Sequence, residues 1–198
     1  MKIKSVKVVS FSTSGNSKKV AEAIAKAIQA PIEHVNLTSP TAKTQKFDEF
    51  QDELAIITSP VYIGRIPYEA AIRIRRLKAN NTPAVLVVTY GTRAYEDALI
   101  ELSDIASEVG FKPIAAGAFI GEHLWSTPDG QWGKGRPDVD DLAKAEAFGK
   151  QVHDKFEGVD NLEDLTPVKV PGVNPYTLSM GMWGPGRLPS PFTDEELY

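Results

Sequence analysis

The fold of this chain is decided by the stretch SFSTSGNSKK at residues 10–19. An apolar, β-branched run at residues 5–11 leads into it, and the residues after it have helical spacing, with Val20, Ile24 and Ile28 on one face. A buried strand, a short hydroxyl-rich loop and an amphipathic helix, in that order, indicate the first unit of a parallel α/β sheet.

The same alternation of strand and helix continues along the chain. The remaining expected strands lie at residues 32–37, 53–59, 84–89 and 111–122. The remaining expected helices run over residues 67–77, 98–109 and 138–156. Pro67 is expected in the first turn of its helix, Gly110 at the end of the next, and Asp138 as an N-cap. The pattern predicts an α/β fold with a doubly wound, five-stranded parallel sheet.

The pattern changes after residue 157. We expect one domain over residues 1–157 and an irregular extension, rich in Pro and Gly, over residues 158–198. Two alternatives are open for the extension, which either wraps around the domain or acts as a linker.

Composition excludes several classes of function. The net charge of -4 provides no basic surplus for binding nucleic acid. The sequence has no cysteine, so these residues hold no disulfide, thiolate metal site or iron–sulfur cluster, and redox chemistry would need an organic cofactor. No apolar run is long enough for a membrane span. We interpret MKIKSVKVVSF at the start as a strand rather than a signal peptide, and expect a cytoplasmic protein.

Ligands of open parallel sheets bind beyond the carboxyl ends of the strands. The first such loop is suited to phosphate, because hydroxyl groups, a close-approaching Gly15 and the N–H groups of a helix start converge there. A nucleoside-triphosphate loop and a dinucleotide fingerprint are both absent, and no acidic residue follows the first strand as in receiver domains. The other loops at this edge are residues 59–67 and 89–97.

Four segments resemble a known family. The S-x-S-G-N-S segment resembles the FMN-phosphate loop of flavodoxins, and SPVYIGRIP at 59–67 is similar to the S-P-V-Y-x-G segment of flavodoxin-like FMN proteins. The segment YGTRAYEDAL, together with AFIGEH and GRPD, resembles the flavodoxin half of two-domain flavodoxin–ferredoxin fusion proteins. The resemblance covers residues 5–157 and implies strand order 2-1-3-4-5 and FMN as cofactor. The chain departs from the fusion proteins in having no cysteine-rich ferredoxin module.

The resemblance also implies which residues bind the cofactor. The phosphate would be held by Ser12, Thr13, Ser14, Gly15, Asn16 and Ser17. The isoalloxazine would be flanked by Pro60, Val61, Tyr62, Ile63 and Gly64 and by Thr89, Tyr90, Gly91, Thr92 and Arg93. The aromatic side chains that would pack on the ring are Tyr62, Tyr90 or Tyr95. The sequence indicates no catalytic residue and no metal ligand.

Five further side chains lie in or near these loops. We interpret Arg65 as solvated, whereas Arg93 either contacts a flavin carbonyl or a substrate, or is solvated. His123 is interpreted as structural, and Trp125 and Trp132 as cover for the edge of the fold, with a lid or docking surface as the alternative.

The resemblance implies an electron carrier that exchanges electrons with a redox partner protein such as a ferredoxin or a reductase. Two alternatives are open. The first is an FMN-dependent NAD(P)H reductase of a quinone or other small acceptor. The second is a flavodoxin-like interaction module without flavin. The sequence does not indicate an oligomeric state.

Overall fold

The computed structural model describes residues 2–124, 126 and 129–177. Five parallel strands form one sheet in the order β2-β1-β3-β4-β5, which confirms the expected order. The strands are β1 (Val6–Ser10), β2 (Ile32–Asn36), β3 (Leu54–Pro60), β4 (Thr82–Tyr90) and β5 (Phe111–Ile120). The helices are α1 (Asn16–Ile28), α2 (Tyr68–Ile74), α3 (Ala98–Glu108) and α4 (Val139–Glu157), with short 3-10 turns η1 (Pro40–Lys43) and η2 (Leu162–Asp164).

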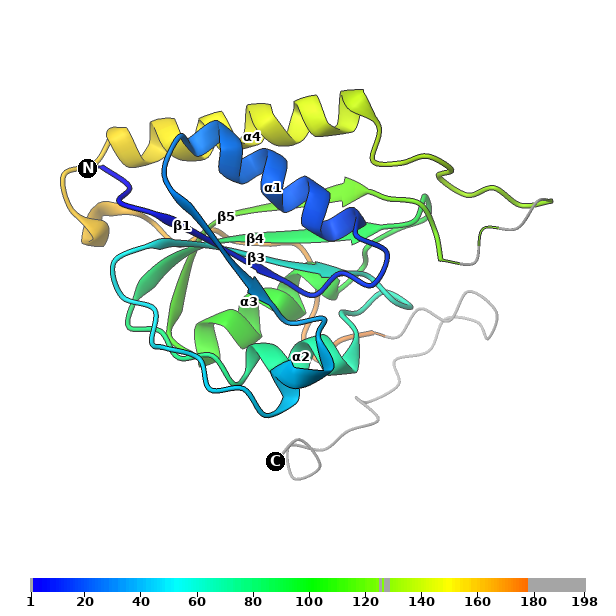
Figure 1. Ribbon diagram of the computed structural model, residues 1–198, viewed down its shortest axis with the longest axis horizontal. Coiled ribbons are helices and arrows are strands. Elements are labelled where there is room, and N and C mark those ends of the chain that lie inside the picture. Colours follow the sequence, from blue (N-terminus) through cyan, green and yellow to red (C-terminus); the bar gives the residue numbers. More distant parts are fainter. Residues whose placement is uncertain (1, 125, 127–128, 178–198) are drawn as a thin grey trace.

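Helices cover both faces of the sheet. Figure 1 shows α1 and α4 on one face and α2 and α3 on the other. Leu54 and Ile56 of β3 belong to the hydrophobic cluster under α1 and α4, while Ala55 and Ile57 belong to the cluster under α2 and α3. Because both faces are buried, the central strands are mostly apolar, and these apolar runs made the strands recognisable in the sequence.

Two expectations about α2 are wrong. Pro67 is the N-cap of this helix rather than part of its first turn: its ψ of 141° is extended, while its carbonyl accepts the Ala71 N–H at 3.0 Å. The helix also ends at Ile74, since the Leu77 N–H returns to the Ile74 carbonyl at 2.9 Å in a tighter turn. Leu77 is nevertheless buried.

The other two expected helix ends are confirmed. Asp138 caps α4 by accepting the N–H groups of Asp140 and Asp141 at 3.1 and 3.0 Å. Gly110 follows α3 with a φ of 95°, in the left-handed region that such helix ends favour.

The described part of the C-terminal extension, residues 158–177, lies against the domain. Leu165 is only 1% exposed and belongs to the cluster under α1 and α4. The Val168 N–H donates to the Pro113 carbonyl at 2.8 Å, and the Lys112 ammonium donates to the Leu162 carbonyl at 3.0 Å. This part of the extension therefore packs on the domain through these contacts. Residues 178–198 lie outside the described part of the chain.

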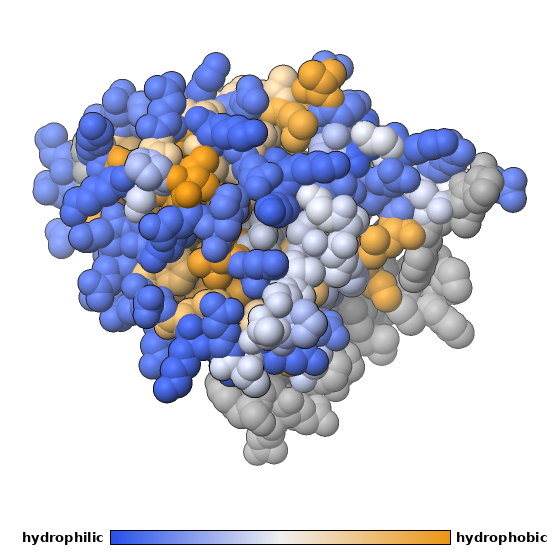
Figure 2. Space-filling model, viewed as in Figure 1, coloured by the Kyte–Doolittle hydropathy of each residue, from blue (hydrophilic) through white to orange (hydrophobic). Residues whose placement is uncertain are grey.

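The surface has little contiguous apolar area on the face shown in Figure 2, where hydrophobic side chains form small separate patches among hydrophilic ones. Among the described helices, none has both the length and the hydropathy needed to cross a bilayer.

Candidate functional site

Four loops meet at the carboxyl edge of the sheet (Figure 1). The loops after β1 and β3 are joined by a hydrogen bond between the hydroxyl groups of Thr13 and Tyr62, whose oxygens are 2.7 Å apart. The Val61 N–H donates to the Thr89 carbonyl at 2.8 Å, which joins the start of the loop after β3 to the end of β4. The four loops are residues 11–15, 61–67 and 91–97 and the described part of residues 121–138.

The first loop presents unpaired donors. Gly15 is the N-cap of α1 with a φ of 85°, and no side chain caps the helix from that position. A Cβ on Gly15 would have no atom within 4 Å, so glycine is required here by the backbone conformation rather than by crowding. Within the described residues, the N–H groups of Thr13, Ser14, Gly15 and Ser17 have no hydrogen-bond acceptor. Backbone donors gathered at the start of a helix favour an anion.

The hydroxyl groups of this loop have different roles. The Ser12 hydroxyl accepts the Lys18 N–H at 3.2 Å, which leaves its own proton free to point outward. Ser17 is buried, and its hydroxyl contacts that of Thr89 on β4, so its side chain joins the helix to the sheet. Thr38, after β2, accepts the Ser12 N–H at 2.8 Å and so shapes the loop. No feature of the sequence indicated this role of Thr38.

The loop after β3 is a tight turn. Tyr62 and Arg65 exchange backbone hydrogen bonds of 2.8 and 3.1 Å, and the two residues between them both have positive φ, 53° for Ile63 and 77° for Gly64. Positive φ at both central positions is the feature of a type I′ turn. A β-branched residue in this region is strained, yet Ile63 is 50% exposed at the tip. Its side chain is therefore available to a ligand at this edge.

The loop after β4 packs directly on this turn. The Asp97 N–H donates to the Gly64 carbonyl at 3.1 Å, and the Glu96 carboxylate lies against Gly64. Tyr90 and Tyr95 meet edge to face, with ring centroids 5.5 Å apart. The three candidate ring-packing tyrosines therefore lie at the same edge of the sheet, Tyr62 and Tyr95 in the loops and Tyr90 at the end of β4. Neither Glu96 nor Asp97 was identified from the sequence as part of the site.

The interpretation of Arg65 as solvated is wrong. Its guanidinium forms two hydrogen bonds with the carboxylate of Glu101 on α3, one of them 2.8 Å long, and its side chain is only 12% exposed. Arg93 remains 57% exposed and is paired with Glu96. Both Arg65 and Arg93 are therefore paired with a carboxylate of this chain.

The loop after β5 stands beside the loop after β4. A Cβ on Gly91 would lie 2.4 Å from the His123 ring, so the two loops are in close contact. His123 meets Trp132 edge to face at 5.9 Å, which agrees with a structural histidine, but Trp132 itself is 51% exposed. Trp125 lies outside the described residues.

The base of this loop is fixed by an ion pair. Arg136 donates to the carboxylate of Asp141, and this hydrogen bond holds the pKa of Asp141 below its usual range, against the opposing effect of burial. Arg136 also donates its N–H to the Gly133 carbonyl at 3.0 Å. The loop is therefore anchored where it enters α4.

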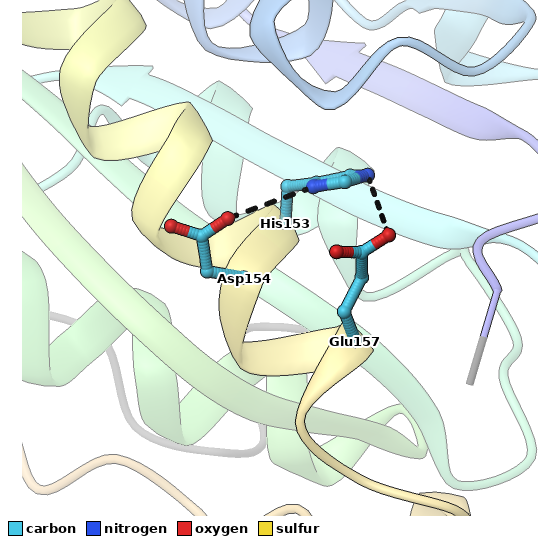
Figure 3. Close-up of side chains that lie close together, drawn as sticks. All are labelled: His153, Asp154 and Glu157. Atoms are coloured by element: carbon cyan, nitrogen blue, oxygen red, sulfur yellow. Dashed lines mark ion pairs between the residues drawn. The ribbon is translucent and has the colours of Figure 1, made fainter.

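A second group of polar side chains lies far along α4 from this edge. Figure 3 shows His153 between Asp154 and Glu157, with ion-pair distances of 3.8 Å from Nδ1 and 3.9 Å from Nε2. The two carboxylates face different nitrogens of one ring and are 77% and 68% exposed. One ion cannot be bound through both nitrogens, so we interpret the group as a cluster of polar side chains on the surface rather than as a cation site.

Several solved structures are similar to this chain in fold. Oxidised Flavodoxin 1 from Bacillus cereus is similar over 79% of this chain and 99% of its own, with 18% identity and a TM-score of 0.52. A flavodiiron core from Synechocystis matches over 80% of this chain and 37% of its own, with 16% identity and a TM-score of 0.55. A WrbA-like flavodoxin from Agrobacterium tumefaciens matches over 79% of this chain and 99% of its own, with 13% identity and a TM-score of 0.51.

No family model and no curated protein sequence matches the chain. The likeness to solved structures shows the fold, and the chain has the flavodoxin-like fold expected from its loops.

Proposed function

We propose that this protein binds FMN at the carboxyl edge of its sheet and carries electrons between redox partner proteins. The observation that carries the proposal is the group of backbone N–H donors and hydroxyl groups in residues 11–17, at the same edge of the sheet as Tyr62, Tyr90 and Tyr95. The flavodoxin-like fold supports it, because known flavodoxins share this arrangement of strands and helices.

The chemistry of the donor set fits a phosphate ester. The N–H groups of Thr13, Ser14, Gly15 and Ser17 would donate to the phosphate, as would the outward hydroxyl protons of Ser12 and Ser14. A dianion has only acceptors, so a site made of donors at a helix start suits it without a bound metal.

The ring would lie between the second and third loops. Pro60, Val61, Tyr62, Ile63 and Gly64 would flank it on one side, and Thr89, Tyr90, Gly91, Thr92, Arg93 and Tyr95 on the other. Bound FMN would supply reversible electron transfer, and the chain's own residues would set the polarity and water access around it. Aromatic faces exclude water and stack favourably on a flat ring.

A specific observation favours one alternative, the NAD(P)H-dependent reductase of a small acceptor. The loop of residues 121–138 stands against Gly91 and Thr92 and would form a wall beside the ring. Addition of NADPH under argon separates the two functions. A carrier retains the absorption of oxidised flavin until a partner reductase is added, whereas a reductase is bleached directly.

The proposal is tested first by reconstitution with FMN and then by substitution at Ser14. Ser14→Asp places a negative charge in the phosphate loop, and two unit charges about 5 Å apart at an effective dielectric constant near 20 repel by about 3 kcal/mol. FMN affinity should therefore fall at least about a hundredfold. Binding of riboflavin, which has no phosphate, should change little.

Ser14→Asn is the matched neutral control and should retain most of the affinity for FMN. If Ser14→Asp binds FMN as well as the parent chain does, the first loop does not hold the phosphate. A protein that stays colourless and unchanged in fluorescence titration with FMN would leave the flavin-free interaction module as the remaining function.

A further inference from the structure

The C-terminal extension is attached to the candidate site through one buried carboxylate. Asp97 lies just before α3 and is only 4% exposed. One of its oxygens accepts the Val173 N–H at 2.9 Å, and the other accepts the Thr177 N–H at 2.6 Å and also the Thr177 hydroxyl. Asp97 therefore accepts three hydrogen bonds from residues 173–177.

Helix capping does not explain this carboxylate. Asp97 occupies the N-cap position of α3, but its side chain makes no capping hydrogen bond. Burial raises the pKa of Asp97, yet the hydrogen bonds from Thr177 and Val173 outweigh burial and hold the pKa below its usual range. A buried carboxylate is tolerated only where donors compensate it, and here the extension provides those donors.

The same segment makes a second contact, with the loop after β3. The Tyr176 hydroxyl donates to Asp104 of α3 at 2.6 Å. The Arg65 guanidinium lies 4.2 Å from the centroid of the Tyr176 ring and is fixed in turn by Glu101. Stacking of a guanidinium on an aromatic face is favourable, so Tyr176 helps to hold the turn that begins at Tyr62.

Asp97 also connects these contacts to the two loops that would flank the flavin. Its N–H donates to the Gly64 carbonyl at 3.1 Å, and it directly follows Glu96, whose carboxylate lies against Gly64. We propose that Asp97 is a positioning residue that clamps residues 173–177 against the loops after β3 and β4 and thereby fixes both loops around the flavin ring. The effect on the flavin ring rests on the proposed FMN site, whereas the contacts between Asp97 and residues 173–177 do not depend on it.

The test is substitution of the clamp on the extension side. Thr177→Val removes the hydroxyl donor without changing the shape of the side chain, and Thr177→Ser restores the donor as the matched control. In the full chain, Thr177→Val should weaken binding of FMN and of riboflavin alike, by about fivefold, because the change acts at the ring and not at the phosphate. The visible circular dichroism of the bound flavin should change in Thr177→Val and return in Thr177→Ser.

Asp97→Asn tests the other side of the same contact. Whichever way the amide is turned, its NH₂ group faces a backbone N–H of the extension, so we expect a larger loss of affinity than in Thr177→Val. Tyr176→Phe breaks only the contact with Asp104 and serves as a second variant if Asp97→Asn does not fold.

Amide hydrogen exchange of peptides covering residues 61–65 and 91–97 provides a readout that does not depend on flavin. Exchange there should be faster in Thr177→Val and normal in Thr177→Ser. Unchanged exchange, affinity and circular dichroism, with only a lower melting temperature, would overturn the inference and leave the contact as a structural anchor. A chain that binds no FMN but shows the expected change in exchange would refute the proposed function and keep the clamp.

Discussion

At Gly64 the loops after β3 and β4 are in close contact, and replacement of this residue tests how the two loops pack against each other. Its φ is 77°, and a Cβ built on it would lie 2.3 Å from one carboxylate oxygen of Glu96 and 3.0 Å from the Glu96 carboxyl carbon. Gly64→Ala therefore combines two costs, one from the backbone conformation and one from crowding.

The expected loss of stability can be worked out from these two costs. An L-residue in the left-handed region costs about 1–2 kcal/mol. Crowding against a packed side chain costs about 1–3 kcal/mol, because Glu96 is only 15% exposed and is paired with Arg93. The smaller entropy of the unfolded alanine chain returns about 0.4–1 kcal/mol. The free energy of unfolding should fall by about 2–3 kcal/mol, the middle of these ranges.

The assay is denaturant unfolding of the flavin-free chain in a double-mutant cycle with Glu96→Ala. That second change removes the carboxylate and leaves only the Glu96 Cβ, 3.1 Å from the new methyl group. In the Glu96→Ala background, the cost of Gly64→Ala should fall by about 1–2 kcal/mol, and the remainder should be the backbone cost. An equal cost in both backgrounds would refute the reasoning, because the carboxylate contact would then contribute nothing.

The remaining predictions concern the helix layer and the pH dependence of stability. Gly149→Ala would place a Cβ 2.4 Å from the Ile24 carbonyl, so α1 and α4 would have to move apart, and unfolding should require about 1–3 kcal/mol less. Gly158→Ala, whose Cβ would meet nothing closer than 3.4 Å, is the control and should be nearly neutral by thermal melting. Asp141→Asn should be less stable than the parent chain at neutral pH, since the pKa of Asp141 is lowered on folding and its ionised form is the stabilising one. The difference should shrink as the pH falls below about 4, where the carboxylate is protonated first in the unfolded chain and then, at lower pH, in the folded one. A constant difference in urea unfolding from pH 7 to 2 would contradict this origin.

The sheet could be predicted from the sequence because its signals are local. Each central strand is buried on both faces, so a run such as LAII at residues 54–57 is apolar at every position. The hydroxyl-rich loop could also be predicted, because Gly15, the residues beside it and the start of α1 are adjacent in the sequence. The strand order followed from resemblance, and the structure confirms it.

The polar contacts of the site could not be predicted in this way. Arg65 and Glu101 are 36 residues apart, and Asp97 and Thr177 are 80 residues apart. Such pairs depend on which loops the strand order brings together and on the register of the helices. Neither can be read from the hydrophobic periodicity of the sequence. Arg65 therefore looked solvated in the sequence, although Glu101 and Tyr176 enclose it.

The two arginines bear on the choice between carrier and reductase. A reductase needs cationic groups that can leave their partners and bind the phosphates of a nicotinamide nucleotide. Release of Arg65 would be energetically costly. Its guanidinium forms two hydrogen bonds with the carboxylate of Glu101, which is only 9% exposed, and removal of one member of a buried ion pair is strongly unfavourable. Arg93 is different, since a pair with one exposed partner contributes at most about 1 kcal/mol and can be exchanged. Of the two arginines in the loops after β3 and β4, only Arg93 is exchangeable, which is a weak basis for binding a dinucleotide and supports the proposed carrier over the reductase.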